Sequence, residues 1–175
     1  MRKILSVPVG RIDSDVLKNI SASLEETFHL SVDIGEEMPV SDDSYHARRR
    51  QYHSTKILKE LQAMRGKDIE RVLGVTDVDL YVPELNFVFG EADIPSGVTV
   101  ISVTRLRQEF YGQPQNRELL IERCVKEAIH ELGHTYNLGH CPDPRCIMFF
   151  SNRQRDTDVK GTGFCSVCKM QVKID

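Results

Sequence analysis

Three histidines and one glutamate between residues 130 and 140 have the residue types and spacing that a catalytic zinc ion requires. His130 and His134 lie four residues apart, so both rings would project from the same side of a helix and reach one metal ion. Glu131 stands beside the first ring, where its carboxylate can accept a proton from a zinc-bound water without entering the coordination sphere. The segment therefore predicts a hydrolytic zinc site with Glu131 as general base.

His140 can be a third ligand only if the chain turns back after His134, because six more helical residues would carry it roughly 9 Å along the axis. Asn137 and Gly139 most readily accept a positive φ in this stretch, and either could end the helix and direct His140 toward the ion. Three protein ligands leave a fourth position for water, whose pKa zinc lowers to about 7. A nucleophile would then be available at neutral pH.

Four cysteines follow the third histidine in the patterns C-x-x-x-x-C and C-x-x-C: Cys141, Cys146, Cys165 and Cys168. Thiolates at these spacings close a tetrahedral zinc site with no open position, which is structural rather than catalytic. Disulfides are the alternative, and a cytosolic location disfavours them. Because Cys141 directly follows His140, we expect the second zinc to brace the third catalytic ligand. The sequence thus predicts two zinc ions per chain, one catalytic and one structural.

The histidine segment resembles the extended motif of the metzincin metalloproteases, H-E-x-x-H-x-x-G-x-x-H. The resemblance implies that its three histidines are the zinc ligands and that Glu131 is the base. Asn137 stands where the pattern has glycine, and asparagine is the side chain that best tolerates a left-handed turn after glycine. The replacement is therefore conservative in backbone terms.

The segment after the motif resembles the archaemetzincin branch of that clan, in which a cysteine follows the third histidine at once and a C-x-M triplet and C-x-x-C come later. Cys146-Ile147-Met148 is the triplet here. The resemblance implies that Met148 forms a methionine turn, a hydrophobic floor beneath the catalytic zinc. Phe150 occupies the place where some metzincins have a tyrosine that serves as a switchable ligand, and it cannot play that part. Further residues considered for the rim of the site are Lys160, Thr162 and Phe164.

Composition and length place these motifs in a soluble globular protein. A chain of 175 residues, 40% hydrophobic and 28% charged, is long enough for one domain with a substantial core. We expect a single domain over residues 1–175, with a scaffold at 1–115, the active-site helix and third ligand at 116–140, and a four-cysteine tail at 141–175. A net charge of −3 gives no reason to expect nucleic acid or anionic membrane as a partner.

The amino-terminal apolar run stops too soon for a secretory signal, and no segment approaches the roughly 20 apolar residues of a membrane helix. These features predict a cytoplasmic protein without a membrane partner, and we expect a monomer. Secreted metzincins often carry a pro-segment whose cysteine caps the metal, and no cysteine precedes Cys124 here. Activity would therefore be restrained by access to the site or by substrate. Cys124 itself lies in an apolar stripe and is interpreted as a small buried hydrophobe.

Hydrophobic periodicity predicts an α/β fold, with a mixed, mainly parallel twisted sheet and packed helices, followed by the zinc-stapled tail. The predicted strands are 4–9, 30–34, 71–76 and 98–103. The predicted helices are one capped by Asp13 or Ser14 with an apolar face from Val16 to Phe28, one over 47–64, and a long one capped by Asn116. The basic run Arg48–Arg50 is interpreted as a solvated helix start. His46 and His53 are interpreted as polar surface or loop residues rather than ligands.

The run from Pro83 to Gly90 alternates apolar and polar residues and suits an edge strand. Metzincins run an antiparallel edge strand above the active-site helix, and an extended peptide pairs with it through backbone hydrogen bonds. The resemblance makes Phe87–Gly90 the candidate for that edge. An ordinary strand of the sheet is the alternative.

Together these features predict a zinc-dependent metallopeptidase that acts on peptide or protein substrates. Zinc would polarise the peptide carbonyl while Glu131 deprotonates the attacking water and passes the proton to the leaving amine. The aromatic residues after Met148 favour an apolar residue next to the scissile bond. The alternative is a catalytically inactive, zinc-stabilised module that binds peptides or proteins, although such a module would need neither Glu131 nor an open three-histidine site.

Overall fold

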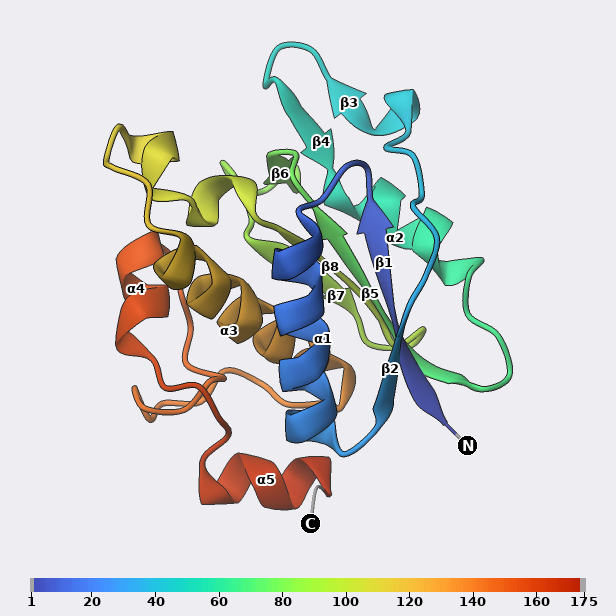
Figure 1. The fold of residues 1–175 in the computed structure, drawn as a ribbon, viewed down its shortest axis with the longest axis vertical. Helices are drawn as coiled ribbons and strands as arrows, with labels where there is room; N and C mark the ends of the chain where they lie inside the picture. Colours follow the sequence, from blue (N-terminus) through green and yellow to red (C-terminus); the bar gives the residue numbers. More distant parts are fainter. Residues whose placement is uncertain (1, 174–175) are drawn as a thin grey trace.

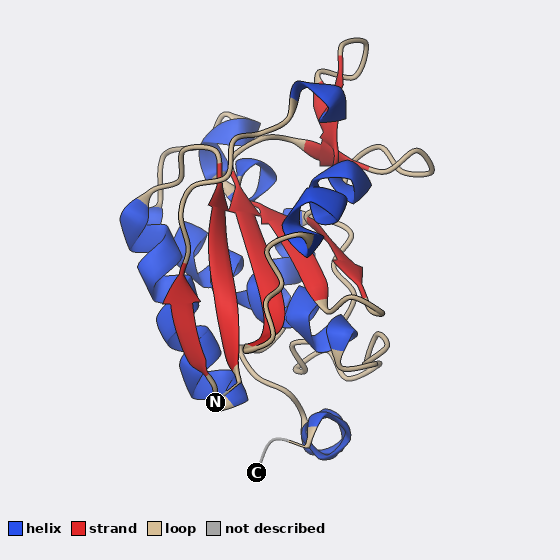
Figure 2. Ribbon diagram, turned by 90° about the vertical axis from the view of Figure 1, so that its right-hand side faces the viewer, coloured by secondary structure: helices blue, strands red, loops and turns tan. Residues whose placement is uncertain are grey.

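A five-stranded sheet forms the centre of the protein, seen in a computed structural model that describes residues 2–173 (Figure 2). The strand order is β2-β1-β5-β8-β7. Neighbouring strands are parallel except for the last pair, in which β7 runs antiparallel to β8. The strands are β1 (Lys3–Val9), β2 (Ser31–Ile34), β5 (Ile69–Thr76), β7 (Gly90–Asp93) and β8 (Val98–Ser102). The predicted mixed, mainly parallel α/β sheet is confirmed.

Helices cover both faces of this sheet (Figure 1). The helices α1 (Ser14–Phe28) and α3 (Arg117–Thr135) pack together on one face, and α2 (Ser54–Gln62) packs on the other. Alternation along β5 explains the two cores, because Leu73 and Val75 join the α1/α3 core while Val72 joins the α2 core. The helix α3 that carries the histidine motif therefore rests on a rigid sheet.

Side-chain caps begin the two helices on the α1/α3 face. Asp13 accepts a hydrogen bond from the backbone N–H of Asp15 at 2.9 Å, and Asn116 accepts one from Leu119 at 3.0 Å. The Asn116 cap was predicted, and Asp13 is the cap among the two candidates before α1. Arg117 also donates to both carboxylate oxygens of Asp13, at 2.8 and 3.0 Å. This contact ties the first turn of α3 to the first turn of α1.

The predicted helix 47–64 is wrong in its first part. The chain there forms a hairpin of β3 (Tyr45–His46) and β4 (Gln51–His53), which joins β6 (Leu80–Tyr81) in a small second sheet. Tyr45 and Tyr52 are cross-strand partners whose rings lie 5.0 Å apart. The turn between the strands places Arg50 at φ 55°, a conformation that no right-handed helix contains. Aromatic pairing across the hairpin outweighs the helical periodicity.

The predicted edge strand at Pro83–Gly90 is also wrong for most of its length, since the antiparallel edge strand β7 begins only at Gly90. Side chains of the hairpin donate hydrogen bonds to backbone carbonyls that would otherwise pair with a neighbouring strand. Arg49 donates to the carbonyl of Leu85 at 2.9 Å, and Gln51 donates to that of Asn86 at 2.9 Å. The Arg49 guanidinium also lies 4.5 Å over the ring of Tyr81. Arg49 therefore holds this loop against the hairpin, and the basic run does not begin a helix.

After α3 the chain wraps beneath α1 and α3 and carries two short helices, α4 (Gln154–Val159) and α5 (Ser166–Val172) (Figure 1). The carbonyl of Arg145 accepts from the backbone N–H of Gly161 at 3.1 Å, and a Cβ built at Gly161 would lie 2.1 Å from that oxygen. Only glycine allows this approach. Among residues 2–173 there is no helix with both the length and the apolar character needed to cross a membrane.

Candidate metal centre

The helix α3 ends at Thr135, one residue after His134, and the chain then reverses. Asn137 takes φ 63°, while Gly139 does not adopt a positive φ, so Asn137 makes the left-handed turn. The backbone N–H of Leu138 returns to the carbonyl of Gly133 at 3.3 Å. This turn brings His140 back beside the end of the helix, as the spacing predicted.

The three histidine rings converge on one point. Ligand nitrogens of His130, His134 and His140 all lie within 4.8 Å of one another. The Nε2 atoms of the first two are 3.1 Å apart, and the ring of His140 lies 5.5 and 5.0 Å from theirs, centre to centre. Three nitrogens at these separations fit one tetrahedral ion with a remaining open position.

Backbone carbonyls orient the two helical rings. His130 Nδ1 lies 2.9 Å from the carbonyl oxygen of Ile147, and His134 Nδ1 lies 2.8 Å from that of Leu138. A carbonyl can only accept, so each Nδ1 carries the hydrogen and each Nε2 is left with its lone pair. Burial lowers the pKa of both rings, and the nearby ammonium of Lys160 lowers it further. Neutral rings with free Nε2 atoms are the form that binds zinc.

Glu131 lies beside this point and is 8% exposed. Burial raises its pKa from 4.5 to about 8, and the neighbouring carboxylate of Glu127 adds to the rise. Gly90, the first residue of β7, allows the side chain to sit there. A Cβ at Gly90 would lie 2.6 Å from Glu131 Cγ and 2.8 Å from the carbonyl oxygen of Val100. The absence of a side chain on the edge strand therefore makes the space for the predicted base.

We expect Gly90→Ala to displace Glu131 and to lower kcat by up to about 100-fold, since catalytic groups lose that much when they are misplaced by an ångström. Zinc content should stay unchanged, because the atoms nearest to the new methyl group belong to Glu131 and Val100 and not to a histidine. Steady-state kinetics and metal analysis measure the two effects. Gly66→Ala is the matched control, because its Cβ would meet only Ile69, at 3.9 Å, and activity should be unaltered.

The pH dependence of stability should report on the buried carboxyl of Glu131 once chelation has removed zinc. Its folded pKa lies above the unfolded value of 4.5, so folding takes up a proton between pH 4.5 and about 8. Stability is therefore greatest below this window and falls as pH rises through it. Each tenfold change in acidity corresponds to about 1.4 kcal/mol, so the loss is on the order of a few kcal/mol.

Thermal unfolding of chelated wild-type protein and chelated Glu131→Gln, followed from pH 5 to pH 9, isolates this effect. The amide does not titrate, so the variant should gain stability relative to wild type as pH rises. Parallel curves for the two proteins would contradict the prediction.

Met148, the predicted floor of the histidine site, is fully buried. A Cβ at Gly133, on the turn of α3 above it, would lie 2.5 Å from the Met148 sulfur. The glycine of the motif thus lets the thioether pack directly against the helix. The Met148 carbonyl accepts from the backbone N–H of Cys141 at 2.9 Å, which ties this floor to the residue after His140.

The four cysteines of the tail also converge, with all sulfur atoms within 4.8 Å of one another. Cys141 and Cys165 sulfurs are 3.8 Å apart, those of Cys146 and Cys168 are 3.7 Å apart, and all four thiols are free. These separations fit the edges of a tetrahedral zinc-thiolate site and exceed the roughly 2.05 Å of a disulfide. The backbone N–H of Cys168 lowers the pKa of Cys165 to about 7, which favours a thiolate there.

The other candidate ligands lie elsewhere. Within residues 2–173, the histidine triad and the cysteine tetrad are the groups that approach metal-ligand geometry. His46 and His53 pack edge-on against Tyr81, 5.7 and 5.2 Å from its ring centre. Cys124 is fully buried in the α1/α3 core, where burial raises its pKa, and it behaves as the predicted small hydrophobe.

A cleft of about 360 Å³ opens above the histidines. The loop Leu85–Gly90 lines it, together with Phe150, Ser151 and Asn152 from the segment after Met148. Phe150 is half exposed, and its ring lies 4.6 Å from that of His140. Aromatic side chains therefore line the space in which a substrate would lie.

The predicted rim residues after position 159 do not line this cleft. Lys160 is buried, at 1% exposed, because it pairs with Glu127 on α3. Thr162 and Phe164 line a separate cavity between α1, α3 and the tail. The position of the tail depends on contacts with α3 that are remote in sequence.

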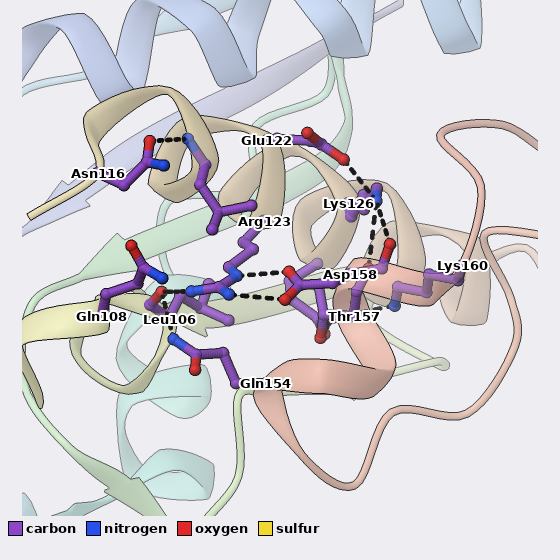
Figure 3. Close-up of polar contacts among 12 residues, drawn as sticks. Leu106, Gln108, Asn116, Glu122, Arg123, Lys126, Gln154, Thr157, Asp158 and Lys160 are labelled. Carbon is purple, nitrogen blue, oxygen red and sulfur yellow. Dashed lines mark hydrogen bonds and ion pairs between the residues drawn. The ribbon is translucent and has the colours of Figure 1, made fainter. Parts of the chain in front are cut away.

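Sequence periodicity missed a set of buried charges on α3. Arg123, Lys126 and Glu127 are 2–3% exposed, although such residues are rarely buried unless they are paired. Arg123 binds both carboxylate oxygens of Asp158 at 2.6 and 2.7 Å, and Lys126 donates to the carbonyl of Thr157 at 3.2 Å (Figure 3). Each charge is buried because α4 packs over it. The sequence pattern of α3 alone does not indicate that another helix packs there.

Known zinc peptidases are similar to this chain in sequence and in structure. The model of peptidase family M54 matches residues 8–174. The archaemetzincin of Pyrococcus furiosus is 45% identical over 172 residues, covering 94% of this chain and 89% of that protein. A zinc-dependent peptidase from Methanocorpusculum labreanum has a similar structure, with a TM-score of 0.88, 31% identity and coverage of 97% and 99%. The archaemetzincin of Archaeoglobus fulgidus, solved with malonate, gives a TM-score of 0.83, 39% identity and the same coverage.

Proposed function

Because the chain belongs to peptidase family M54 and is a zinc metallopeptidase of the archaemetzincin kind, we propose that it hydrolyses peptide bonds in the cleft above α3, with Glu131 as general base. The observation that carries the proposal is the convergence of three neutral histidine rings beside a buried carboxylate. This is the arrangement that zinc hydrolases use.

The histidine triad fits the catalytic ion, and His130, His134 and His140 would hold it. Zinc supplies a Lewis acid for the peptide carbonyl and acidifies water when bound. The carbonyls of Ile147 and Leu138 keep the first two rings in the tautomer that presents Nε2. Met148 closes the site from below and excludes water from that side.

Glu131 would take the proton of the attacking water and deliver it to the leaving amine. Its side chain is held for this task between α3 and Gly90 of β7, where no other side chain competes for the space. Burial favours the protonated form of Glu131. The carboxylic acid that forms when Glu131 takes up the proton is therefore stable in this environment. The carboxyl is thus suited to act first as base and then as acid.

The four cysteines would hold a second, structural zinc, so we propose two ions per chain. Cys141 follows His140 directly, and Cys146 and Met148 flank Ile147, whose carbonyl orients His130. The structural ion would therefore brace both the third ligand and the orientation of the first. We also propose that residues 1–175 form a single domain, which consists of the scaffold at 1–115, the active-site helix and third ligand at 116–140, and the four-cysteine tail at 141–175.

The substrate would lie along β7. This strand pairs with β8 on one side, and no other strand of the described chain pairs with its outer edge. An extended peptide could add to that edge by backbone hydrogen bonds, beginning at Gly90 above Glu131. Phe87 and Phe150, which both line the cleft, favour an apolar side chain near the scissile bond. Cytoplasmic location, the absence of nucleic acid and membrane partners, and a monomeric state stay predictions.

Zinc analysis of the purified protein, together with cleavage of a peptide library, tests the proposal. We expect two zinc ions per chain and hydrolysis that stops on chelation and returns with zinc. Two zinc ions without cleavage would favour the inactive binding module. One ion or none would contradict the two-site arrangement.

A further inference from the structure

A second carboxylate, that of Glu127, lies in the cleft one helical turn before Glu131. Glu127 is 2% exposed and lines the same cleft as the histidines. Lys160 comes from the tail and meets it, with Nζ 2.9 Å from Glu127 Oε1. The ammonium compensates the buried negative charge, which would otherwise be strongly unfavourable.

Both protein hydrogen bonds to Glu127 go to the same oxygen. Thr157 Oγ1 donates to Oε1 at 3.0 Å, beside the bond from Lys160. These two donors reach α3 from the segment 157–160, which Arg123 and Lys126 hold against the helix (Figure 3). The carboxylate is therefore fixed in one orientation by contacts on its far side.

The other oxygen, Oε2, has no hydrogen-bond partner among residues 2–173. A carboxylate oxygen can accept two hydrogen bonds. Oε2 is not among the buried side-chain atoms that lack a partner, so it is accessible from the cleft. Lys160 and Thr157 neutralise and hold the carboxylate through Oε1 alone, which leaves the second oxygen available to a ligand in the cleft. The free acceptor therefore indicates a donor that arrives with the ligand.

We infer that Glu127 is a substrate-binding residue, whose Oε2 accepts a hydrogen bond from an N–H group of the peptide near the scissile bond. The inference rests on the proposed peptidase function and deepens it. Lys160 and Thr157 are positioning residues that act through Oε1. The donor is either a backbone amide of an internal segment or the free α-ammonium of a chain end, and both present the same N–H chemistry.

The test measures peptide binding separately from catalysis. The zinc-loaded Glu131→Gln protein is used to select from a random library a hexapeptide that binds, and its affinity is measured by calorimetry. Adding Glu127→Gln should weaken binding by about 10- to 100-fold, the usual cost of losing a hydrogen bond to a charged group. Its amide oxygen can still accept from Lys160 and Thr157, which turns the NH₂ group, a donor, toward the donor of the peptide.

The matched control is Glu118→Gln in the same background, since this glutamate is exposed in the first turn of α3. Affinity should stay within twofold in the control, and zinc content should be equal in all variants. Unchanged affinity in Glu127→Gln would overturn the inference, as would a library from which no peptide binds. Cleavage by the wild-type protein is scored independently, so a failure of the peptidase proposal is distinguishable.

Glu127→Gln leaves the buried ammonium of Lys160 without its counter-charge. If that variant does not fold, Glu127→Gln with Lys160→Met removes both charges, and buried pairs tolerate joint replacement. The same loss of affinity supports the inference in this background, and unchanged affinity overturns it. The peptide is tested with a free and an acetylated amino terminus. A loss confined to the free form identifies the α-ammonium as donor, and an equal loss identifies a backbone amide.

Discussion

Glu131→Ala is expected to lower kcat for peptide hydrolysis by about 10²- to 10⁴-fold, the contribution typical of a positioned general base. The carboxylate is one residue from His130 but is not needed for the histidine nitrogens to converge, so both zinc ions should stay bound. The new methyl group fills less space beside Gly90, and water enters where the carboxylate stood. The fold should be retained, because the substitution removes a buried titratable group without exposing the core.

Single-turnover kinetics and zinc analysis on the same preparation measure this result. Glu131→Gln provides the isosteric comparison, because it keeps the contact with Gly90 and removes only the proton acceptor. It should be as inactive as the alanine variant. Activity within tenfold of wild type in either variant, with zinc bound, would show that another group accepts the proton.

Cys168→Ser is expected to lose the tail zinc and to weaken binding of the catalytic zinc as well. Cys168 is buried and its sulfur lies 3.7 Å from that of Cys146. The chain continues from Cys146 directly into Ile147, whose carbonyl orients His130, and into Met148. Loss of a group that orients a metal-bound histidine typically costs 10- to 100-fold in metal affinity. We expect that loss at the histidine site, although its nearest ligand, His140, lies far from Cys168 in the sequence.

Competition with a chromogenic chelator should resolve the two affinities, because four thiolates and three imidazoles are expected to release zinc in separate steps. Cys124→Ala is the matched control, since this cysteine is buried in the core and lies outside the tetrad. Both sites should keep wild-type affinity there, with only a modest loss of stability from the cavity. Wild-type affinity at the histidine site of Cys168→Ser would show that the two sites are independent.

Local rules were sufficient for much of the fold. The strands β1, β5 and β8, the helix α1 and the cap of α3 at Asn116 were all predicted within a few residues, because alternation, helical spacing and capping act between neighbours in the chain. The turn after His134 also follows from local chemistry. Asn137 and Gly139 were both candidates, and the backbone takes its positive φ at Asn137.

Errors arose where distant segments supply the partners. The helix predicted over 47–64 begins at Ser54, because Tyr45 pairs with Tyr52 across a hairpin that then joins Leu80–Tyr81. The strand predicted over Pro83–Gly90 is a loop, because Arg49 and Gln51 occupy its carbonyls. Neither contact is visible in the periodicity of the segment that it changes.

The sequence by itself predicted which side chains converge in the two candidate metal sites, since ligand type and spacing around His130 and Cys141 are local properties of the chain. Tertiary structure decided how that chemistry is surrounded. Gly90 makes room for Glu131 only because β7 lies against α3, and Lys160 fixes Glu127 only because the tail folds back over the helix. A buried charge and its partner lie 33 residues apart here, and no pattern within a single helix specifies such a pair. Burial makes each charge unfavourable and the partner compensates it, and both effects exist only once the chain has folded.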